Sequence, residues 1–272
     1  MGASLSSHFQ RFLTAAVVIP FLFAYIVWGG PLLFALLIWV GLLLGTYEYF
    51  HLTGAERARG EIGLHGVLGT IALLGAYFYG LEGLFGSLIF NFMVLVIYLV
   101  LTFKETVLFF DRLGKQLFAL CYLPLFLSFF ILLRGGPQGI HWIFFVLAVN
   151  YAGDTAAYYT GRTLGRNKLA PAVSPKKTWE GSIGGLAANC LMAWIFRQTL
   201  FNPFSAGEMI LLGLTVGILS QFGDLLESML KRASGVKDSG NLFPGHGGFL
   251  DRVDSLLLAA PVVYFFLRIG HG

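Results

Sequence analysis

Charged residues are scarce in this sequence. Asp, Glu, Lys and Arg make up only 12% of its 272 residues, whereas 57% are hydrophobic, and the mean hydropathy is +0.76. Soluble domains carry about 25% charged residues, so this composition excludes an ordinary soluble domain. It predicts an integral membrane protein, and no nucleic-acid partner is expected.

Cysteine is nearly absent, and a cleavable signal peptide is missing. Cys121 and Cys190 lie in apolar segments and form no CxxC motif, which predicts two buried apolar side chains. The first apolar run leads directly into a second run without a small-residue cleavage site. Neither a disulfide framework nor a removed leader is therefore expected.

Long apolar runs are what the sequence has instead. A spanning helix needs about 17–25 mainly apolar residues, and an open sheet edge in lipid would leave backbone groups unpaired. We therefore predict an all-α polytopic membrane protein with about nine transmembrane helices, about five of them in residues 1–135 and the others in residues 136–272. The last two runs are short and can extend into flanking residues. The nine runs are Phe12–Trp28, Pro31–Tyr47, Ile62–Tyr79, Leu84–Phe103, Leu117–Leu133, Ile140–Tyr159, Gly181–Leu200, Met209–Phe222 and Leu256–Ile269.

The basic residues orient the chain. With nine spans and the amino terminus inside, the cytoplasmic side holds all 18 Lys and Arg residues except Arg134, Arg197 and Arg268, in line with the positive-inside rule. The same topology places two polar regions, Gly161–Glu180 and Gly223–Asp254, on one face. We expect a polar site at that cytoplasmic face.

The first polar region contains an acidic residue and a basic pair. Asp154 lies inside the sixth predicted span, where an ionisable group is costly and indicates a site; capping of a helix or pairing with an arginine is the alternative. Ser174 precedes Lys176 and Lys177, which suit either an anionic lipid surface or a phosphate. The acidic, glycine-rich segment on the same face favours phosphate binding.

The second polar region gathers carboxylates. Asp224 and Glu227 are one helical turn apart and share a face if the eighth span continues. Asp251 and Asp254 have the same spacing. Clustered carboxylates repel each other unless a hard cation lies among them, and Mg²⁺ is the usual cation where phosphates complete its shell.

Glycines and basic residues complete this region. The glycines would let backbone N–H groups approach phosphate oxygens, and the basic side chains would balance the charge of a polyphosphate. A solvated juxtamembrane loop is the alternative, but such loops seldom combine all these features. The residues concerned are Gly240, Gly245, Gly247, Gly248, Lys231, Arg232 and Lys237. Metal-assisted phosphate chemistry is the prediction.

The run from Ser228 to Asp254 resembles the signature of the phosphatidate cytidylyltransferases, also called CDP-diglyceride synthases. Upstream residues from Asn150 onward resemble that family too, whereas the amino-terminal half carries no usable motif. The matching residues are Ser228, Lys231-Arg232, Lys237-Asp238, Gly240, Phe243-Pro244, His246-Gly247-Gly248, Asp251-Arg252-Val253-Asp254 and, upstream, Asp154, Ala157-Tyr158, Gly161-Arg162 and Ser174 to Gly181.

The resemblance implies that CTP and phosphatidate from the bilayer form CDP-diacylglycerol and pyrophosphate during phospholipid biosynthesis. It implies Mg²⁺ as cofactor and allows a second, monovalent cation. It also implies a homodimer among membrane lipids, in the bacterial inner membrane, with the active site facing the cytoplasm.

The family pattern also suggests individual roles. Asp224 and Asp251 lead as metal ligands, followed by Asp254 and Asp238. His246 would donate to a phosphate or fix the glycine turn. The catalytic candidates are Asp224, Asp251, Lys231, Arg232 and His246. The substrate-binding candidates are Lys176, Lys177, Lys237, Ser174, Gly247, Gly248, Arg252 and Asp154.

Three other functions fit parts of the pattern. A CTP-dependent lipid kinase would use the same metal and cations but would release CDP. A CDP-alcohol phosphotransferase would need an Asp-Gly-x-x-Ala-Arg motif followed by two aspartates, and this motif is missing from the sequence. A transporter would leave the polar segment unexplained.

Overall fold

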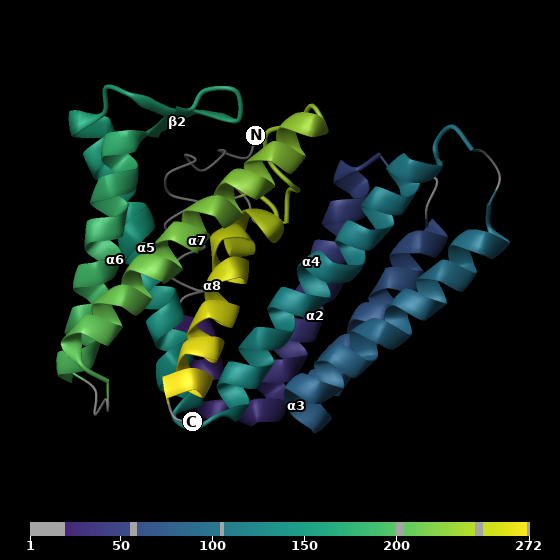
Figure 1. Cartoon of the computed structure of the whole chain (residues 1–272), viewed down its shortest axis with the longest axis horizontal. Helices are drawn as coiled ribbons and strands as arrows, with labels where there is room; N and C mark the ends of the chain where they lie inside the picture. The colour runs from purple at the N-terminus through teal and green to yellow at the C-terminus, as the bar shows by residue number, and fades with distance from the viewer. Residues whose placement is uncertain (1–19, 55–58, 104–105, 200–203, 243–246, 271–272) are drawn as a thin grey trace, which may run out of the picture. The chain divides into compact units, whose positions relative to one another are not determined.

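The chain folds mainly as helices (Figure 1). The computed structural model describes residues 20–54, 59–103, 106–199, 204–242 and 247–270, of which residues 20–28 are helical. The elements that follow are α2 (Gly30–Leu52), α3 (Arg59–Leu101), α4 (Phe109–Gly135), α5 (Gly139–Leu164), β1 (Lys168–Ala170), β2 (Ser174–Thr178), α6 (Trp179–Thr199), α7 (Ala206–Ala233) and α8 (Leu250–Gly270).

Several helices have the length and composition of membrane spans. Within the described ranges, five are long and apolar enough to cross a bilayer, namely α2, α3 from Gly60, α4, α7 and α8. This agrees with the predicted all-α membrane protein. Nine crossings are not established by the structure, so that number stays a prediction. The two short runs do extend, because α7 has 28 residues and α8 has 21.

The helices group into two compact units. The first contains the residues up to Gly135 together with Asp238–Arg252, and the second contains Gly136–Lys237 together with the residues from Val253 onward. The boundary between the units thus falls inside α8. Residues Asp238–Arg252 of the acidic segment pack with the amino-terminal helices. The sequence-based division into residues 1–135 and 136–272 did not include this packing.

In the first unit, α3 doubles back at Gly80. This glycine has φ +66°, a conformation that side chains with a Cβ rarely adopt. The two arms meet closely, because a Cβ built on Gly83 would lie 2.2 Å from the Gly75 carbonyl oxygen. Asn91 Nδ2 donates across the hairpin to the Leu68 carbonyl at 2.7 Å. The two arms correspond to the third and fourth predicted runs, and the glycines of Gly80–Gly83 between those runs predict the tight turn that the structure shows.

The first unit has its apolar core between α3 and α4. Leu68, Leu95, Leu99 and Leu120 form a buried cluster there. The contacts among these apolar side chains hold α4 against both arms of α3. The unit therefore has a core of its own.

In the second unit, small residues let α5 and α6 approach closely. A Cβ on Gly181 would lie 2.7 Å from the Ala157 carbonyl oxygen, and one on Gly184 would lie 2.5 Å from Thr160 Oγ1. Small residues at a helix interface allow this short spacing in membrane proteins. The small residues of the seventh run, among them Gly181 and Gly184, predict such a close helix contact, and the structure confirms it.

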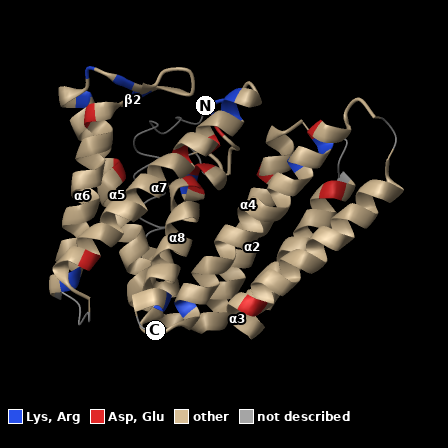
Figure 2. Cartoon of the chain, in the orientation of Figure 1, with Lys and Arg blue, Asp and Glu red and all other residues tan. Residues whose placement is uncertain are grey.

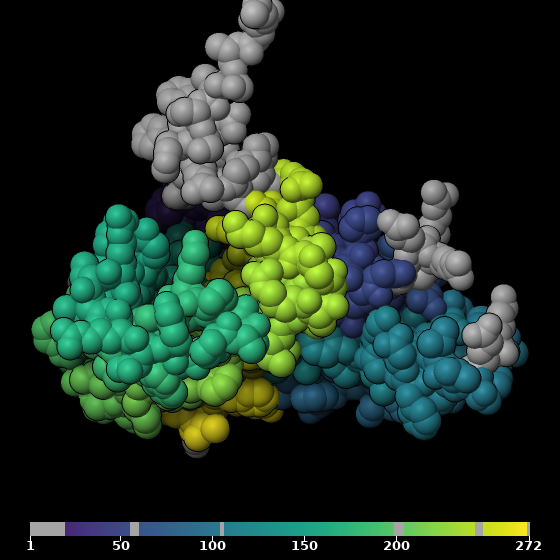
Figure 3. All heavy atoms as spheres, turned by 90° about the horizontal axis from the view of Figure 1, so that it is seen from above, coloured from purple at the N-terminus to yellow at the C-terminus, as the bar shows by residue number. Residues whose placement is uncertain are grey.

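The polar loop between α5 and α6 forms an antiparallel hairpin, which the sequence did not predict. Lys168 pairs with Thr178, and Ala170 pairs with Ser174. In the second unit, charged residues gather at the end of the helices that carries this hairpin and the carboxyl-terminal turns of α7 (Figure 2). Figure 3 looks onto this end, where the teal-green hairpin lies beside the yellow-green end of α7.

Candidate active site

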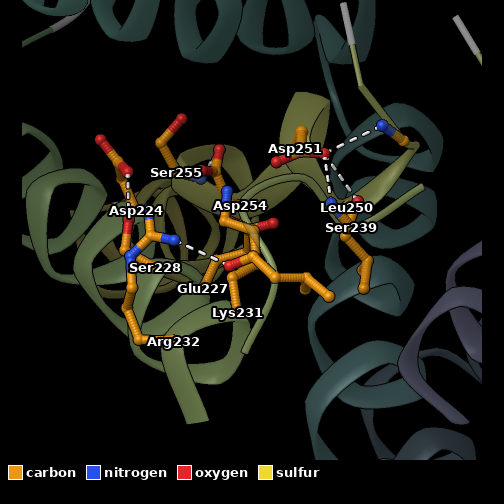
Figure 4. Close-up of polar contacts among 12 residues, drawn as sticks. Asp224, Glu227, Ser228, Lys231, Arg232, Ser239, Leu250, Asp251, Asp254 and Ser255 are labelled. Carbon is orange, nitrogen blue, oxygen red and sulfur yellow. Dashed lines mark hydrogen bonds and ion pairs between the residues drawn. The ribbon is translucent and has the colours of Figure 1, made fainter. Parts of the chain in front are cut away.

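One face of α7 carries the polar residues of the second unit. Because α7 continues to Ala233, Asp224 and Glu227 share a helical face as predicted, and Ser228 and Lys231 follow at the same helical spacing. Ser228 Oγ donates to Asp224 Oδ1 at 3.5 Å. Glu227 is fully buried and forms an ion pair with Lys231, which is 9% exposed (Figure 4). A buried charge needs such a partner, so this pair is fixed in place.

The β1–β2 hairpin adds a basic side chain to this face. Lys177 of β2 forms an ion pair with Asp224, and both side chains are partly exposed. Arg232 Nε donates to the Val173 carbonyl at 3.3 Å, and Arg232 NH1 donates to the Val236 carbonyl at 2.7 Å. The hairpin is therefore tied to the carboxyl-terminal turns of α7 through Lys177 and Arg232.

Two further aspartates of the second unit lie near Asp224. Asp254 of α8 interacts electrostatically with Asp224, Lys231 and Asp154 of α5. Gly223 permits this approach, because a Cβ there would lie 2.5 Å from the Asp254 carbonyl oxygen. Three aspartates, Glu227 and two lysines thus share one region of the second unit.

An asparagine links α5 to α8 beside these aspartates. Asn150 Nδ2 donates to Asp154 Oδ2 at 3.3 Å and to Ser255 Oγ at 2.9 Å. Asp254 Oδ1 accepts from the Ser255 backbone N–H at 2.7 Å. These bonds orient the carboxylates on both helices.

Glu180 fastens the other end of the hairpin. The pKa of this carboxyl is lowered, first by the backbone N–H at its own position and further by Asn167 and by the Arg166 backbone. Asn167 Nδ2 donates to it at 2.8 Å. A lowered pKa means that the charged carboxylate stabilises this junction above its ordinary pKa, and that the contribution is lost as pH falls through the lowered value.

Asp251 cross-links the acidic segment of the first unit through hydrogen bonds. Its Oδ2 accepts from the Ser239 backbone N–H at 2.8 Å, from Ser239 Oγ at 2.8 Å and from the Gly248 N–H at 2.9 Å (Figure 4). Gly247 has φ +81°, and a Cβ there would lie 2.5 Å from Asp251 Oδ2. Both glycines therefore have a structural use beside this carboxylate, and their predicted contact with substrate stays a prediction.

Sequence reasoning missed one residue that contacts the same segment. Glu48 of α2 is 6% exposed, and its carboxylate accepts from the N–H groups of Phe249 and Leu250 at 2.8 and 2.9 Å. The second predicted run ended one residue before it. The rule applied to Asp154, that an ionisable group in an apolar span indicates a site, would have found Glu48.

The remaining candidates contribute less to the described contacts. Lys176, Lys237, Asp238 and Arg252 are exposed, and Ser174 begins β2. His246 lies outside the described residues, so the structure gives no account of its role. The roles predicted for all of these residues stay predictions.

The donor set of the second unit fits Mg²⁺. Within the described ranges, no three His, Cys, Asp or Glu side chains converge closely enough to enclose a metal ion. Mg²⁺ does not require such a cage, because it is usually held by one or two carboxylates and by substrate phosphates. Asp224 and Asp254 offer two carboxylates of this kind. Asp251 belongs to the first unit, so the predicted pairing of Asp224 with Asp251 stays a prediction.

The chain matches a known protein family along nearly its whole length. The family model described as "Cytidylyltransferase family" matches residues 9–270. The chain belongs to the cytidylyltransferase family. Membership confirms the resemblance that the polar motifs indicated, and it covers the amino-terminal helices in which no motif was seen.

Relatives from three bacteria align with nearly the whole chain, and each is called phosphatidate cytidylyltransferase. The protein from Bacillus subtilis (strain 168) is 35% identical over 96% of the chain and 97% of its own length. The protein from Pseudomonas aeruginosa is 38% identical, covering 93% and 94%. The protein from Thermotoga maritima is 35% identical, covering 96% and 97%.

Proposed function

We propose that the chain transfers the cytidylyl group of CTP to phosphatidate, giving CDP-diacylglycerol and pyrophosphate. The observation that carries this proposal is the cluster in the second unit, where three aspartates and two lysines meet at one end of apolar helices. The names of the full-length relatives support the choice of CTP and phosphatidate as substrates.

The reaction needs charge control more than proton transfer. A phosphate oxygen of phosphatidate forms a bond to the α-phosphorus of CTP, the bond from that phosphorus to the β-bridging oxygen breaks, and pyrophosphate leaves with the electron pair. A phosphomonoester has its second pKa near about 6, so the attacking oxygen is largely ionised and needs no strong base. The barrier lies in bringing two anions together, which positive groups must offset.

The lysines of the cluster supply this positive charge in two ways. Lys177 is partly exposed and paired with Asp224, so an incoming phosphate can take Lys177 and release the aspartate. Lys231 is buried with Glu227, so it stays fixed and acts through its field. Arg232 and Lys237, near the same end of α7, are placed to attract the triphosphate.

Mg²⁺ fits this exchange of partners. When bound, Mg²⁺ would neutralise phosphate charge and raise the electrophilicity of the α-phosphorus. Asp224 and Asp254 would hold it, with Asp251 and Asp238 as further predicted ligands. An Mg²⁺-dependent rise in melting temperature in the presence of CTP, lost in Asp224→Asn, would support this assignment without any turnover.

The setting follows from the substrates. CTP arrives from the cytoplasm and phosphatidate from the bilayer, so we place the charged end of the second unit at the cytoplasmic surface of the bacterial inner membrane. About nine crossings with the amino terminus inside, and a homodimer, complete this proposal. Cysteine-accessibility labelling at the hairpin, from each side of the membrane, tests its orientation.

Labelled CTP tests the reaction. The purified protein is incubated with phosphatidate, Mg²⁺ and CTP labelled at either the α- or the γ-phosphorus. We expect the α-label in lipid and the γ-label in pyrophosphate. The γ-label in lipid would instead identify a lipid kinase, and movement of intact substrate without product would identify a transporter.

A further inference from the structure

Glu48 is buried in the first unit. It contacts the segment that contains Ser239, Phe249 and Leu250, which lies about two hundred residues later in the chain. Its Oε1 accepts from the Phe249 N–H at 2.8 Å, and its Oε2 accepts from the Leu250 N–H at 2.9 Å and from Ser239 Oγ at 3.0 Å. The N–H groups of Phe249 and Leu250 lie at the amino-terminal end of α8, where helix donors lack partners within the helix. A carboxylate from α2 thus caps α8.

The surface of α2 is shaped for this contact. Gly41, Gly45 and Glu48 follow one another at helical spacing and face the segment together. A Cβ on Gly41 would lie 2.5 Å from the Phe249 ring, and one on Gly45 would lie 3.3 Å from it. The two glycines therefore make room for the Phe249 ring, one turn away from the carboxylate that binds its backbone.

The segment is shaped in turn for Glu48. A Cβ on Gly240 would lie 2.8 Å from Glu48 Oε1, and one on Gly248 would lie 2.5 Å from both carboxylate oxygens. These two glycines let the backbone reach the acid from both sides. Four glycines and three hydrogen bonds form this contact between Glu48 and the segment. We call it the anchor.

The anchored segment carries Asp251, which is predicted to be both a catalytic residue and a metal ligand. Ser239 donates to Asp251 Oδ2 as well as to Glu48, so the two carboxylates share one hydroxyl. Asp251 and Asp254 both follow Leu250 in the first turns of α8. Because a helical turn is rigid, any displacement of Leu250 displaces Asp251.

We propose that Glu48 is a positioning residue for the transfer reaction. It touches neither substrate, and it acts by fixing the start of α8 and Ser239, and through them Asp251. This inference rests on the proposed function. Misplacing a catalytic group by about 1 Å can cost about 100-fold in rate, so loss of the anchor should lower kcat more than it raises KM.

Three variants of the anchor and one control test this proposal. Glu48→Gln keeps the length but leaves one acceptor oxygen, Glu48→Ala removes both, and Ser239→Ala removes only the shared hydroxyl. Gln116→Ala is the matched control, since Gln116 is also buried and polar in the first unit but bonds to His65. It reports the effect of losing buried hydrogen bonding away from the anchor.

Kinetics give the first readout. We expect kcat for CDP-diacylglycerol formation to fall about 10-fold in Glu48→Gln and about 100-fold in Glu48→Ala, with KM for CTP changing less than about 3-fold. Gln116→Ala should keep kcat within about 3-fold of the parent. An unchanged kcat in both Glu48 variants would overturn the proposal.

Trypsin gives a second readout that needs no activity. Lys237 and Arg252 flank the segment, and both are exposed. Cleavage after them should be at least about 10-fold faster in Glu48→Ala than in Gln116→Ala, because release of the anchor opens the segment locally. Equal cleavage rates would overturn the proposal, even if activity fell.

The two readouts separate this inference from the proposed function. If the unmodified protein makes no CDP-diacylglycerol, the proposed function fails, while the cleavage assay still decides whether Glu48 anchors the segment. If Glu48→Ala does not fold, the milder Ser239→Ala takes its place. In Ser239→Ala, kcat should fall by about 3- to 10-fold and the rate of trypsin cleavage should rise by about 3- to 10-fold. A parental kcat and a parental cleavage rate in that variant would overturn the proposal.

Discussion

Replacing Asp224 by asparagine should remove activity while leaving the fold nearly intact. The substitution deletes one negative charge with little change of shape. In the free protein Asp224 pairs with Lys177 and accepts from Ser228 Oγ, and the asparagine Oδ1 can still accept that hydrogen bond. The substitution removes the ion pair, the electrostatic interaction with Asp254 and the predicted contact with the metal.

The cost to stability is small because the ion pair is partly exposed. The side chains of Lys177 and Asp224 are 26% and 34% exposed. Pairs that reach solvent contribute about 0.2–1 kcal/mol, which corresponds to about 4 °C or less in melting temperature. Removing one electrostatic contributor to a transition state, by contrast, costs about 100- to 1,000-fold in rate.

The assay compares turnover with stability in the same preparation. Pyrophosphate release gives kcat with phosphatidate, Mg²⁺ and CTP in excess, and thermal unfolding in detergent gives the melting temperature. The matched control is Asp111→Asn, which breaks the exposed Asp111–Lys115 pair of the first unit. The control should change neither quantity appreciably.

Two results would refute this reasoning. More than about a tenth of the parental kcat in Asp224→Asn would remove this carboxylate from the reaction, since removing an electrostatic contributor should cost at least about 100-fold. A fall in melting temperature beyond about 8 °C would mean that Asp224 holds the fold together, in which case lost activity would say nothing about catalysis.

Three further predictions concern other residues. Glu227→Gln breaks the buried ion pair with Lys231 and should cost about 3–5 kcal/mol, so its melting temperature should fall well below that of Asp224→Asn; an equal stability would contradict the buried pair. Gly248→Ala drives a Cβ into Glu48 and should cost about 1–3 kcal/mol and lower kcat; parental unfolding and kinetics would contradict this contact. The protection of residues 165–180 against hydrogen exchange, relative to the unfolded chain at the same pH, should fall in acid as Glu180 is protonated, because its pKa is lowered in the fold, and Glu180→Gln should show lower protection at neutral pH without the further fall in acid; an unchanged acid dependence in that variant would contradict the role of Glu180.

The helices and their small-residue contacts could be read from the sequence. Apolar runs of spanning length can only satisfy their backbone as helices in lipid, so the arms of α3 and the turn at Gly80 followed from composition and glycine alone. The extension of α7 followed from the length that a spanning helix needs, because the eighth run was too short to cross a bilayer. These features depend on neighbours that are close in sequence.

The features that depend on distant contacts could not be read in this way. Strand residues Lys168–Ala170 and Ser174–Thr178 are too short and polar to show a period of two, so the hairpin was not predicted. Glu48 acts on residues about two hundred positions away, and no local pattern shows which segment it binds. The partner of Lys177 was likewise not predicted, because it depends on how the hairpin packs on α7.

The most direct test of the account is the product balance of the purified protein. With phosphatidate, Mg²⁺ and CTP, we predict one pyrophosphate released for each CDP-diacylglycerol formed, and loss of both products in Asp224→Asn. Formation of CDP without pyrophosphate, or an equal yield from Asp224→Asn, would contradict nucleotidyl transfer at this cluster.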